Sequence, residues 1–189
     1  LMQQAVPAGS GAMFAIIGLD DDAIAKACAE SAEGSVVSPV NYNSPGQVVI
    51  AGEKAAVERA AAACKAAGAK MTVALPVSVP SHCALMKPAA DELAKALIEV
   101  TFSEPTINVV NNVDVAMPTD SQAIKDALVR QLYCPVRWSE SVEFMATQGV
   151  TKLIECGPGK VLTGLTKRIN KSISAQAVND AASFAALVE

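Results

Sequence analysis

The order of secondary-structure elements expected over residues 12–77 is the strongest constraint that this sequence places on its fold. Short apolar runs predict strands, and they fall at residues 12–19, 35–41, 47–51 and 70–77. Two segments with apolar residues at helical spacing, 20–31 and 53–67, follow the first and third of these runs. The resulting order, β-α-β-β-α-β, is that of the split βαβ unit and predicts a ferredoxin-like subdomain.

The ends of these two helices carry residues that helix termini favour. Asp20 is expected to cap the first helix, because its carboxylate can accept hydrogen bonds from free backbone N–H groups. Asp21 and Asp22 then lie in the first turn, where the helix macrodipole favours negative charge. The three aspartates therefore predict a helix start and not a cation site. Gly68 is expected to end the second helix.

Helices and short strands alternate after residue 84, which predicts part of a parallel α/β sheet. Strands are expected at residues 107–110, 151–155 and 173–178, and helices at residues 87–100, 121–132, 139–148, 160–169 and 181–187. The 121–132 helix, capped by Asp120 or Ser121, is expected to bury Ile124, Ala127, Leu128 and Leu132. Gln131 shares this apolar face, where a buried amide needs hydrogen-bond partners or a polar cavity.

Composition argues against several classes of protein. Apolar residues make up 51% of the chain and aromatic residues only 4%, so the core is built mainly from Ala, Val, Ile and Leu. The net charge of −4 lacks the concentrated Lys and Arg that nucleic-acid binding requires, and no apolar run has the length of a membrane span. Five cysteines without a C-x-x-C pair, beside one histidine, predict no zinc site. Cys28 and Cys64 lie on helix faces, which favours reduced thiols in a cytoplasmic protein.

His82 is the only histidine among 189 residues, and therefore the only side chain suited to act as a general base near neutral pH. It lies in a loop between the apolar run that ends at Val77 and the helix expected from Lys87, a place where α/β folds carry catalytic residues. A hydrogen-bonded structural histidine explains the position equally well. Cys83 adjoins His82, but sequence neighbours rarely have the geometry of a nucleophile and its base.

Residues 157–159, Gly-Pro-Gly, connect an expected strand to an expected helix. A glycine turn before a helix N-terminus is one way to bind an anionic ligand. The sequence contains neither G-x-x-x-x-G-K-[ST] nor G-x-G-x-x-G, so a simple tight connection is the favoured interpretation.

Four motifs occur in order along the chain. They are Asn41-x-Asn43-Ser44-Pro45-Gly46-Gln47-x-Val49-Ile50-x-Gly52, Val77-Ser78-Val79-Pro80-Ser81-His82, Asn111-Asn112-Val113 and Gly157-Pro158-Gly159-Lys160-Val161-Leu162. Together they resemble the malonyl-CoA:acyl carrier protein transacylases of bacterial type II fatty acid synthesis. The resemblance runs from about Met2 to the end of the chain, and the acyltransferase domains of polyketide synthases share it more loosely.

The resemblance implies an α/β fold in which a ferredoxin-like α+β subdomain interrupts an α/β-hydrolase-like large domain, with the active site between them. Residues 8–77 would then form the ferredoxin-like small subdomain. Residues 78–189, together with residues 1–7, would form the C-terminal part of the α/β-hydrolase-like large domain.

The resemblance also implies a ping-pong transfer of a malonyl group from coenzyme A to acyl carrier protein. A serine in a Gly-x-Ser-x-Gly turn carries the acyl group, and His82 matches the histidine that acts as general base and then as general acid. Gln131 matches the residue whose backbone carbonyl orients that imidazole, and Ser81 belongs to the same supporting set. Neither a cofactor nor a metal is implied, since the phosphopantetheine is carried by the partner.

One departure from the family is large, because the chain contains no Gly-x-Ser-x-Gly. The family's nucleophile, its oxyanion-hole glutamine and the arginine that pairs with the malonyl carboxylate align upstream of Leu1. Ser10, Ser78 and Ser81 do not lie on a strand-to-helix turn between glycines, so none of them replaces the nucleophile. We therefore expect the C-terminal portion of a transacylase, inactive without the missing N-terminal part of the same enzyme.

Alternatives stay open at this point. Lys160, Lys167 and Arg168 belong to a segment, residues 157–179, without acidic residues, and either dock an acidic carrier protein or form a solvated helix face. The chain is part of an acyltransferase of the fatty-acid or polyketide type, a non-catalytic ferredoxin-like binding module, or a pseudoenzyme or fragment without a function of its own. The motifs favour an acyltransferase that acts in the cytoplasm on malonyl-CoA and acyl carrier protein, with neither nucleic acid nor membrane as partner.

Overall fold

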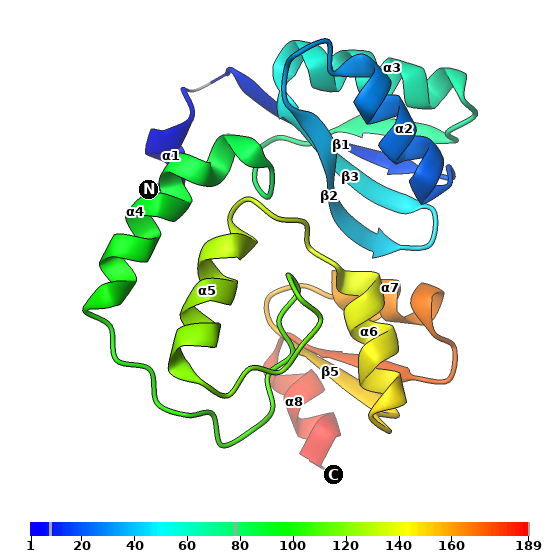
Figure 1. The fold of residues 1–189 in the computed structure, drawn as a ribbon. Coiled ribbons are helices and arrows are strands. Elements are labelled where there is room, and N and C mark those ends of the chain that lie inside the picture. The colour runs from blue at the N-terminus through cyan, green and yellow to red at the C-terminus, as the bar shows by residue number, and fades with distance from the viewer. Residues whose placement is uncertain (8, 78, 189) are drawn as a thin grey trace.

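The computed structural model describes residues 1–7, 9–77 and 79–188, and it shows the chain as two packed parts (Figure 1). A sheet with two helices occupies the top of the view, and a mainly helical part with a second, smaller sheet lies below it. Residues 8 and 78, at which the expected subdomains begin, lie outside the described residues, as does residue 189. The division into residues 8–77 and 78–189 stays a prediction.

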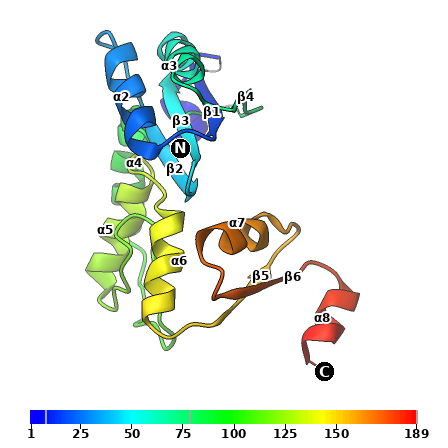
Figure 2. The same ribbon diagram turned by 90° about the vertical axis from the view of Figure 1, so that its right-hand side faces the viewer.

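The first sheet has four antiparallel strands in the order β2-β3-β1-β4. Its strands are β1 (Gly11–Ile17), β2 (Val37–Ser44), β3 (Gln47–Glu53) and β4 (Met71–Ala74). Helices α2 (Asp21–Ser31) and α3 (Lys54–Ala66) pack together on one face of the sheet (Figures 1 and 2). The predicted β-α-β-β-α-β order is confirmed, and β1 and β3 occupy the centre, as the ferredoxin-like unit requires.

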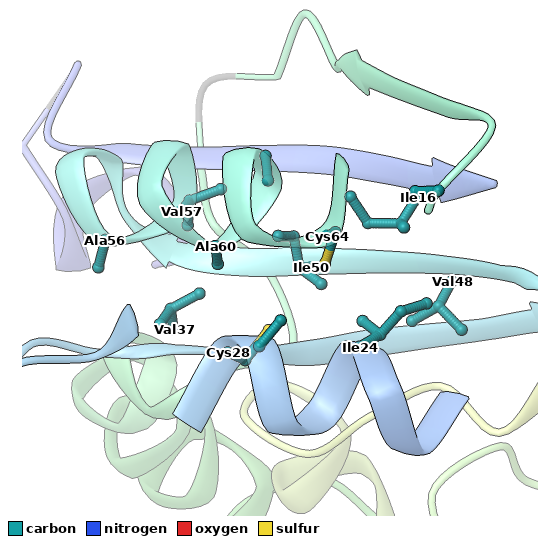
Figure 3. Close-up of a cluster of buried hydrophobic side chains, with 13 residues drawn as sticks. Ile16, Ile24, Cys28, Val37, Val48, Ile50, Ala56, Val57, Ala60 and Cys64 are labelled. Atoms are coloured by element: carbon teal, nitrogen blue, oxygen red, sulfur yellow. The ribbon is translucent and has the colours of Figure 1, made fainter. Parts of the chain in front are cut away.

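Side chains from this sheet and both helices form one hydrophobic core (Figure 3). Ile16 of β1, Ile24 of α2 and Ile50 of β3 are fully buried in it. Cys28 and Cys64 lie in the same core, where burial raises the pKa of the Cys28 thiol to about 12. Both cysteines are free thiols that pack as small apolar groups, as the sequence predicts.

The two helix caps predicted at aspartates are confirmed. The Asp20 carboxylate accepts a hydrogen bond from the backbone N–H of Asp22 at 3.0 Å, at the start of α2. The Asp120 carboxylate accepts from the N–H groups of Gln122 and Ala123 at 3.1 and 2.8 Å. Each cap satisfies backbone donors that the first turn of a helix leaves without partners.

Strand β4 is shorter than the run of residues 70–77 predicts, because it ends at Ala74. The backbone N–H of Leu75 still donates to the Met13 carbonyl at 2.9 Å. Pro76 follows and has no N–H with which to extend the ladder. The chain therefore leaves the sheet here and continues into the loop that carries His82.

The second part of the chain is built from helices around a pair of parallel strands. Its elements are η1 (Ala84–Met86, a 3-10 turn), α4 (Lys87–Ile98), α5 (Ser121–Gln131), α6 (Trp138–Thr147), β5 (Lys152–Cys156), α7 (Val161–Ile169), β6 (Ser174–Val178) and α8 (Ala181–Val188). A short helix that the sequence does not predict, α1 (Met2–Ala5), contacts α4 and η1. None of the helices formed by the described residues combines the length and apolar character needed to cross a bilayer.

The predicted strand at residues 107–110 is wrong. Ile107 and Val109 are 78% and 61% exposed, and in the described part of the chain this segment joins neither sheet. The parallel sheet therefore has two strands and not three. The predicted burial of Leu128 is also wrong, since this side chain is 42% exposed, whereas Ala127 beside it is buried. A strand needs a neighbour to satisfy its backbone, and an apolar helix face needs an element to pack against.

Candidate active site

Pro80 holds the loop of His82 against the first sheet. The proline is buried, and a Cβ at Gly11 would lie 2.5 Å from its ring, so only a glycine at the start of β1 leaves room for it. Within the loop, the Ser81 N–H donates to the Val79 carbonyl at 3.0 Å. The histidine is thus carried by a packed turn between the end of β4 and η1.

The backbone of His82 is left-handed, with φ of +66°. A conformation of this kind costs on the order of 1 kcal/mol in residues other than glycine, and it persists only where the surroundings fix it. Here the backbone N–H of His82 donates to the Leu132 carbonyl at 3.0 Å, just after the end of α5. This hydrogen bond ties the loop to the second part of the chain.

The His82 ring makes a second contact with the same end of α5. Its Nδ1 lies 2.7 Å from the backbone carbonyl oxygen of Gln131, in a half-buried position. A carbonyl oxygen only accepts hydrogen bonds, so this contact requires a proton on Nδ1. The neutral ring then has Nε2 free as an acceptor, which is the state that a general base needs.

Gln131 contributes its side chain and its main chain to different contacts. The side-chain amide donates to the carbonyls of Cys134 and Pro135 at 3.2 and 3.3 Å, which satisfies the amide on its otherwise apolar helix face. The backbone carbonyl is among those that a helix C-terminus leaves without an intrahelical partner, so it is available to His82. The negative end of the helix macrodipole also favours a ring that becomes cationic.

Two neighbours of His82 do not supply a nucleophile. The Cys83 side chain is 1% exposed, its thiol donates to the Pro80 carbonyl at 3.2 Å, and burial raises the pKa of the thiol. A cysteine nucleophile acts as the thiolate, so Cys83 is inert, in agreement with the sequence prediction. Ser81 contributes its backbone to the turn, and a supporting role for it in the chemistry stays a prediction.

The predicted docking residues lie on another element. Lys160, Lys167 and Arg168 are exposed at the start and in the last turn of α7. In Figure 2, α6 lies between α7 and α5, the helix whose end holds His82. The Nη1 of Arg168 donates to Oε1 of Gln47 at 2.6 Å, which links α7 to the first residue of β3.

The N-terminus of α7 is occupied by a carboxylate of the chain itself. Glu155 of β5 accepts from the backbone N–H groups of Leu162 and Thr163 at 3.1 and 2.7 Å, and from the Thr163 hydroxyl at 2.7 Å. Burial tends to raise the pKa of Glu155, but these hydrogen bonds outweigh it and hold the pKa below its ordinary value. The Gly-Pro-Gly turn is therefore a tight connection, as favoured from the sequence, because Glu155 fills the place of an anionic ligand.

Two largely apolar cavities flank Val109 and Asn112 in the second part of the chain. One, of about 390 Å³, is also lined by Phe102, Ile124 and Gln131, and the other, of about 350 Å³, by Trp138, Ile154 and Leu162. His82 lines neither of these two cavities. Among the residues that the structure describes, no group of three or more His, Cys, Asp or Glu side chains is placed to hold a metal ion.

A lone histidine held by a backbone carbonyl, on a loop between a ferredoxin-like sheet and a second α/β part, agrees with what the resemblance implies for an acyltransferase. Comparison with known protein families identifies that class directly. The family model described as the acyl transferase domain matches residues 1–187, and the chain belongs to this family.

Relatives of known name are similar to nearly the whole chain. The malonyl CoA-acyl carrier protein transacylase of Salmonella typhimurium is 71% identical over 185 residues, which is 98% of this chain and 60% of the relative. The protein of the same name from Escherichia coli K12 is 69% identical over 188 residues, which is 100% of this chain and 61% of the relative. The chain thus spans about 60% of the length of these relatives.

Solved structures show the same fold. An acyl carrier protein S-malonyltransferase from Vibrio cholerae superposes with a TM-score of 0.96 at 72% identity, over 98% of this chain and 61% of that one. A malonyl-transacylase in complex with a type II PKS acyl-carrier protein also gives 0.96, at 65% identity, over 97% of this chain and 60% of that one.

Proposed function

We propose that the protein to which this chain belongs transfers a malonyl group from coenzyme A to acyl carrier protein in fatty acid biosynthesis. The names of the relatives supply the substrates. The observation that carries a Ser-His mechanism is the 2.7 Å contact between Nδ1 of His82 and the Gln131 carbonyl, because it leaves Nε2 free to take a proton.

In the first half-reaction, Nε2 of His82 takes the proton of a serine hydroxyl as the serine oxygen attacks the thioester carbonyl of malonyl-CoA. The new oxygen–acyl bond forms, the carbon–sulfur bond breaks, and the imidazolium gives its proton to the departing thiolate. The phosphopantetheine thiol of the carrier protein then reverses these steps and takes the malonyl group. The Gln131 carbonyl keeps the ring oriented and stabilises the imidazolium at each stage, in place of a triad carboxylate.

The serine is proposed to come from the part of the relatives' length that this chain does not span. The chain contains no Gly-x-Ser-x-Gly, so the 189 residues by themselves are expected to be inactive. The exposed apolar side chains of Ile107, Val109 and Val161 support a missing partner segment, because they form surface that another element would bury.

Acyl carrier protein is proposed to dock on the exposed basic residues of α7, Lys160, Lys167 and Arg168. Positive charge in the last turn of a helix is also explained by the macrodipole, which is the competing interpretation. The relative solved with a type II PKS acyl-carrier protein makes a polyketide-type carrier the alternative acceptor. A location in the cytoplasm and the absence of a cofactor stay predictions.

The test is the kinetics of His82→Ala in the whole protein, with malonyl-CoA and acyl carrier protein as substrates. Loss of a general base is expected to lower kcat by about 10²–10⁴-fold. Cys83→Ala is the matched control, because Cys83 is the next residue and is buried without a role in proton transfer. If kcat falls less than about tenfold in His82→Ala, His82 has a structural role and is not the general base. If the parent protein transfers no malonyl group at all, a non-catalytic binding module is favoured.

A further inference from the structure

The end of α5 that holds His82 is itself fixed by an ion pair. Arg130 precedes Gln131, and its guanidinium meets the carboxylate of Asp114, with Nη1 on Oδ1 and Nη2 at 2.8 Å from Oδ2. A bidentate arginine–carboxylate pair constrains the orientation of both groups as well as their distance.

The Asp114 carboxylate is presented by a closed turn. The backbone N–H of Asp114 donates to Oδ1 of Asn111 at 2.7 Å, and the N–H of Asn111 donates to the Ala116 carbonyl at 2.9 Å. Val115, between them, has φ of +57°, and its N–H donates back to the Asn111 carbonyl at 3.2 Å. These contacts make the turn a fixed support for the ion pair.

The hydrogen bonds of the Arg130 backbone carbonyl also bear on which carbonyls at the end of α5 remain free to accept from His82. Its own carbonyl accepts from the N–H groups of Tyr133 and Cys134 at 3.1 and 2.8 Å, which closes the turn after the helix. The next two carbonyls, of Gln131 and Leu132, are those that accept from Nδ1 and from the backbone N–H of His82. A rotation of the chain at Arg130 would displace both acceptors together.

The charged groups around Asp114 favour its ionised form, which is the form that pairs with Arg130. The hydrogen bonds from Arg130 hold the pKa of Asp114 below its ordinary value, although burial opposes them, and Arg137 adds a weaker attraction. The side chains of Arg130 and Asp114 are 38% and 33% exposed. Ion pairs at this exposure contribute little to the free energy of unfolding, so an effect on His82 can be separated from a loss of stability.

We propose that Asp114 and Arg130 are positioning residues for His82. The pair holds the last turn of α5 at the rotation in which the Gln131 carbonyl accepts from Nδ1, and it thereby keeps the histidine in the tautomer with Nε2 free. The kinetic consequence rests on the proposed malonyl transfer, whereas the effect on the tautomer does not.

The experiment measures the tautomer of His82 by ¹⁵N NMR in the whole protein labelled on histidine, with the His82 signals assigned by their loss in His82→Ala. Arg130→Gln and Asp114→Asn are expected to replace a single Nδ1–H tautomer by a mixture in which Nε2–H is substantial. They are also expected to lower kcat for malonyl transfer about tenfold and to leave KM within about twofold, because a misplaced catalytic group affects the chemical step.

Glu140→Gln is the matched control, because it breaks the similar bidentate pair that Glu140 of α6 makes with Arg137, the residue before this helix. In this variant, the tautomer of His82 and the kcat for malonyl transfer are expected to equal those of the parent protein. Arg130→Lys keeps the charge without the planar fork, and we expect an intermediate tautomer mixture at parental thermal stability. This variant keeps the test decisive if Arg130→Gln fails to fold.

A parental tautomer in Arg130→Lys and Asp114→Asn would overturn the proposal, whether or not kcat falls. A mixed tautomer in Glu140→Gln would overturn it too, because the effect would then not depend on the Asp114–Arg130 pair. If the parent protein transfers no malonyl group, the proposed function fails, but the tautomer comparison still decides whether the pair positions His82.

Discussion

The two parts of the chain differ in how completely they bury their own apolar residues. In the first sheet, Ile16, Ile24 and Ile50 are fully buried between the strands and two helices. In the second part, Ile107 and Val109 are 78% and 61% exposed, and Val109 lines two largely apolar cavities. The difference shows that the first part has a core of its own, whereas the second has apolar surface of the kind that marks an interface. His82 lies at the junction of the two.

The largest expected effect compares one isoleucine from each part. Ile24→Ala removes a fully buried side chain and is expected to lower the free energy of unfolding of the 189-residue chain by about 2–5 kcal/mol. Ile107→Ala removes an exposed one and is expected to change it by less than about 0.5 kcal/mol. Urea unfolding followed by circular dichroism measures both, and equal losses would show that the second part has a comparable core.

The same contrast explains how much of the fold the sequence predicts. Strands β1 to β4, helices α2 and α3 and the Asp20 cap of α2 follow from local patterns, because the buried residues of the main core all lie within residues 11–74. The strand expected at 107–110 has an equally apolar pattern, but pattern alone does not say whether a neighbouring strand exists. The prediction therefore fails where it assumes a neighbouring strand that the described residues do not supply.

The next effect concerns the contact that joins the histidine loop to the first sheet. Gly11→Ala places a Cβ 2.5 Å from the Pro80 ring and is expected to lower the free energy of unfolding by about 1–3 kcal/mol. Gly164→Ala is the control from the second part, since it lies inside α7 with no atom within 4 Å of the new Cβ. We expect Gly164→Ala to stabilise the chain by about 0.5–1 kcal/mol through helix propensity.

Thermal unfolding of the two glycine variants gives the sign of each effect. A stable Gly11→Ala variant with an unchanged His82 NMR signal would contradict the packing of Pro80 on β1 as the support of the loop. A destabilised Gly164→Ala variant would show that α7 is packed on the side that the structure leaves open.

A smaller effect separates docking from catalysis. Charge reversal at Lys167 and Arg168 is expected to lower kcat/KM for acyl carrier protein about fivefold to tenfold, and more at low salt, while hydrolysis of malonyl-CoA is unchanged. Lys26→Glu, on α2 of the first part, is the matched control, because its side chain is 74% exposed and belongs to another helix. Equal losses with both substrates, or an equal effect of Lys26→Glu, would contradict docking on α7.

The smallest effects come from two carboxyl groups whose pKa values shift in opposite directions. Burial, with repulsion from Asp20 and Asp22, raises the pKa of Asp21, and one of its oxygens is buried without a hydrogen-bond partner among the described residues. The Arg130 guanidinium lowers the pKa of Asp114. At pH 7, Asp21→Asn is therefore expected to stabilise the chain and Asp114→Asn to destabilise it, each by about 0.5 kcal/mol or less.

Urea midpoints as a function of pH check these signs. The gain in Asp21→Asn should vanish as the pH falls below the unfolded-state pKa of about 3.9, because the carboxyl is then protonated in both states. The stabilising contribution of Asp114 should be present above that pH and be lost as the pH falls through its lower folded-state pKa. Shifts of the same sign in both variants would contradict the environments described for them.

The site is less predictable from the sequence than the first sheet. The position of His82 on a loop follows from local patterns, and the Gln131 carbonyl was implied by resemblance alone. The Asp114–Arg130 pair joins residues 16 apart in sequence, across a turn that has no regular periodicity, so no local pattern indicates it. Such contacts are set by where a loop and the end of a helix meet in space.

We propose above all that this chain carries the histidine base of a malonyl transfer and not its nucleophile. The most direct measurement is peptide mapping of the malonyl-enzyme formed when the whole protein is incubated with malonyl-CoA and quenched. We expect the malonyl ester on a serine outside residues 1–189, with its formation strongly slowed in His82→Ala. A malonyl group on any residue within 1–189 would contradict the claim.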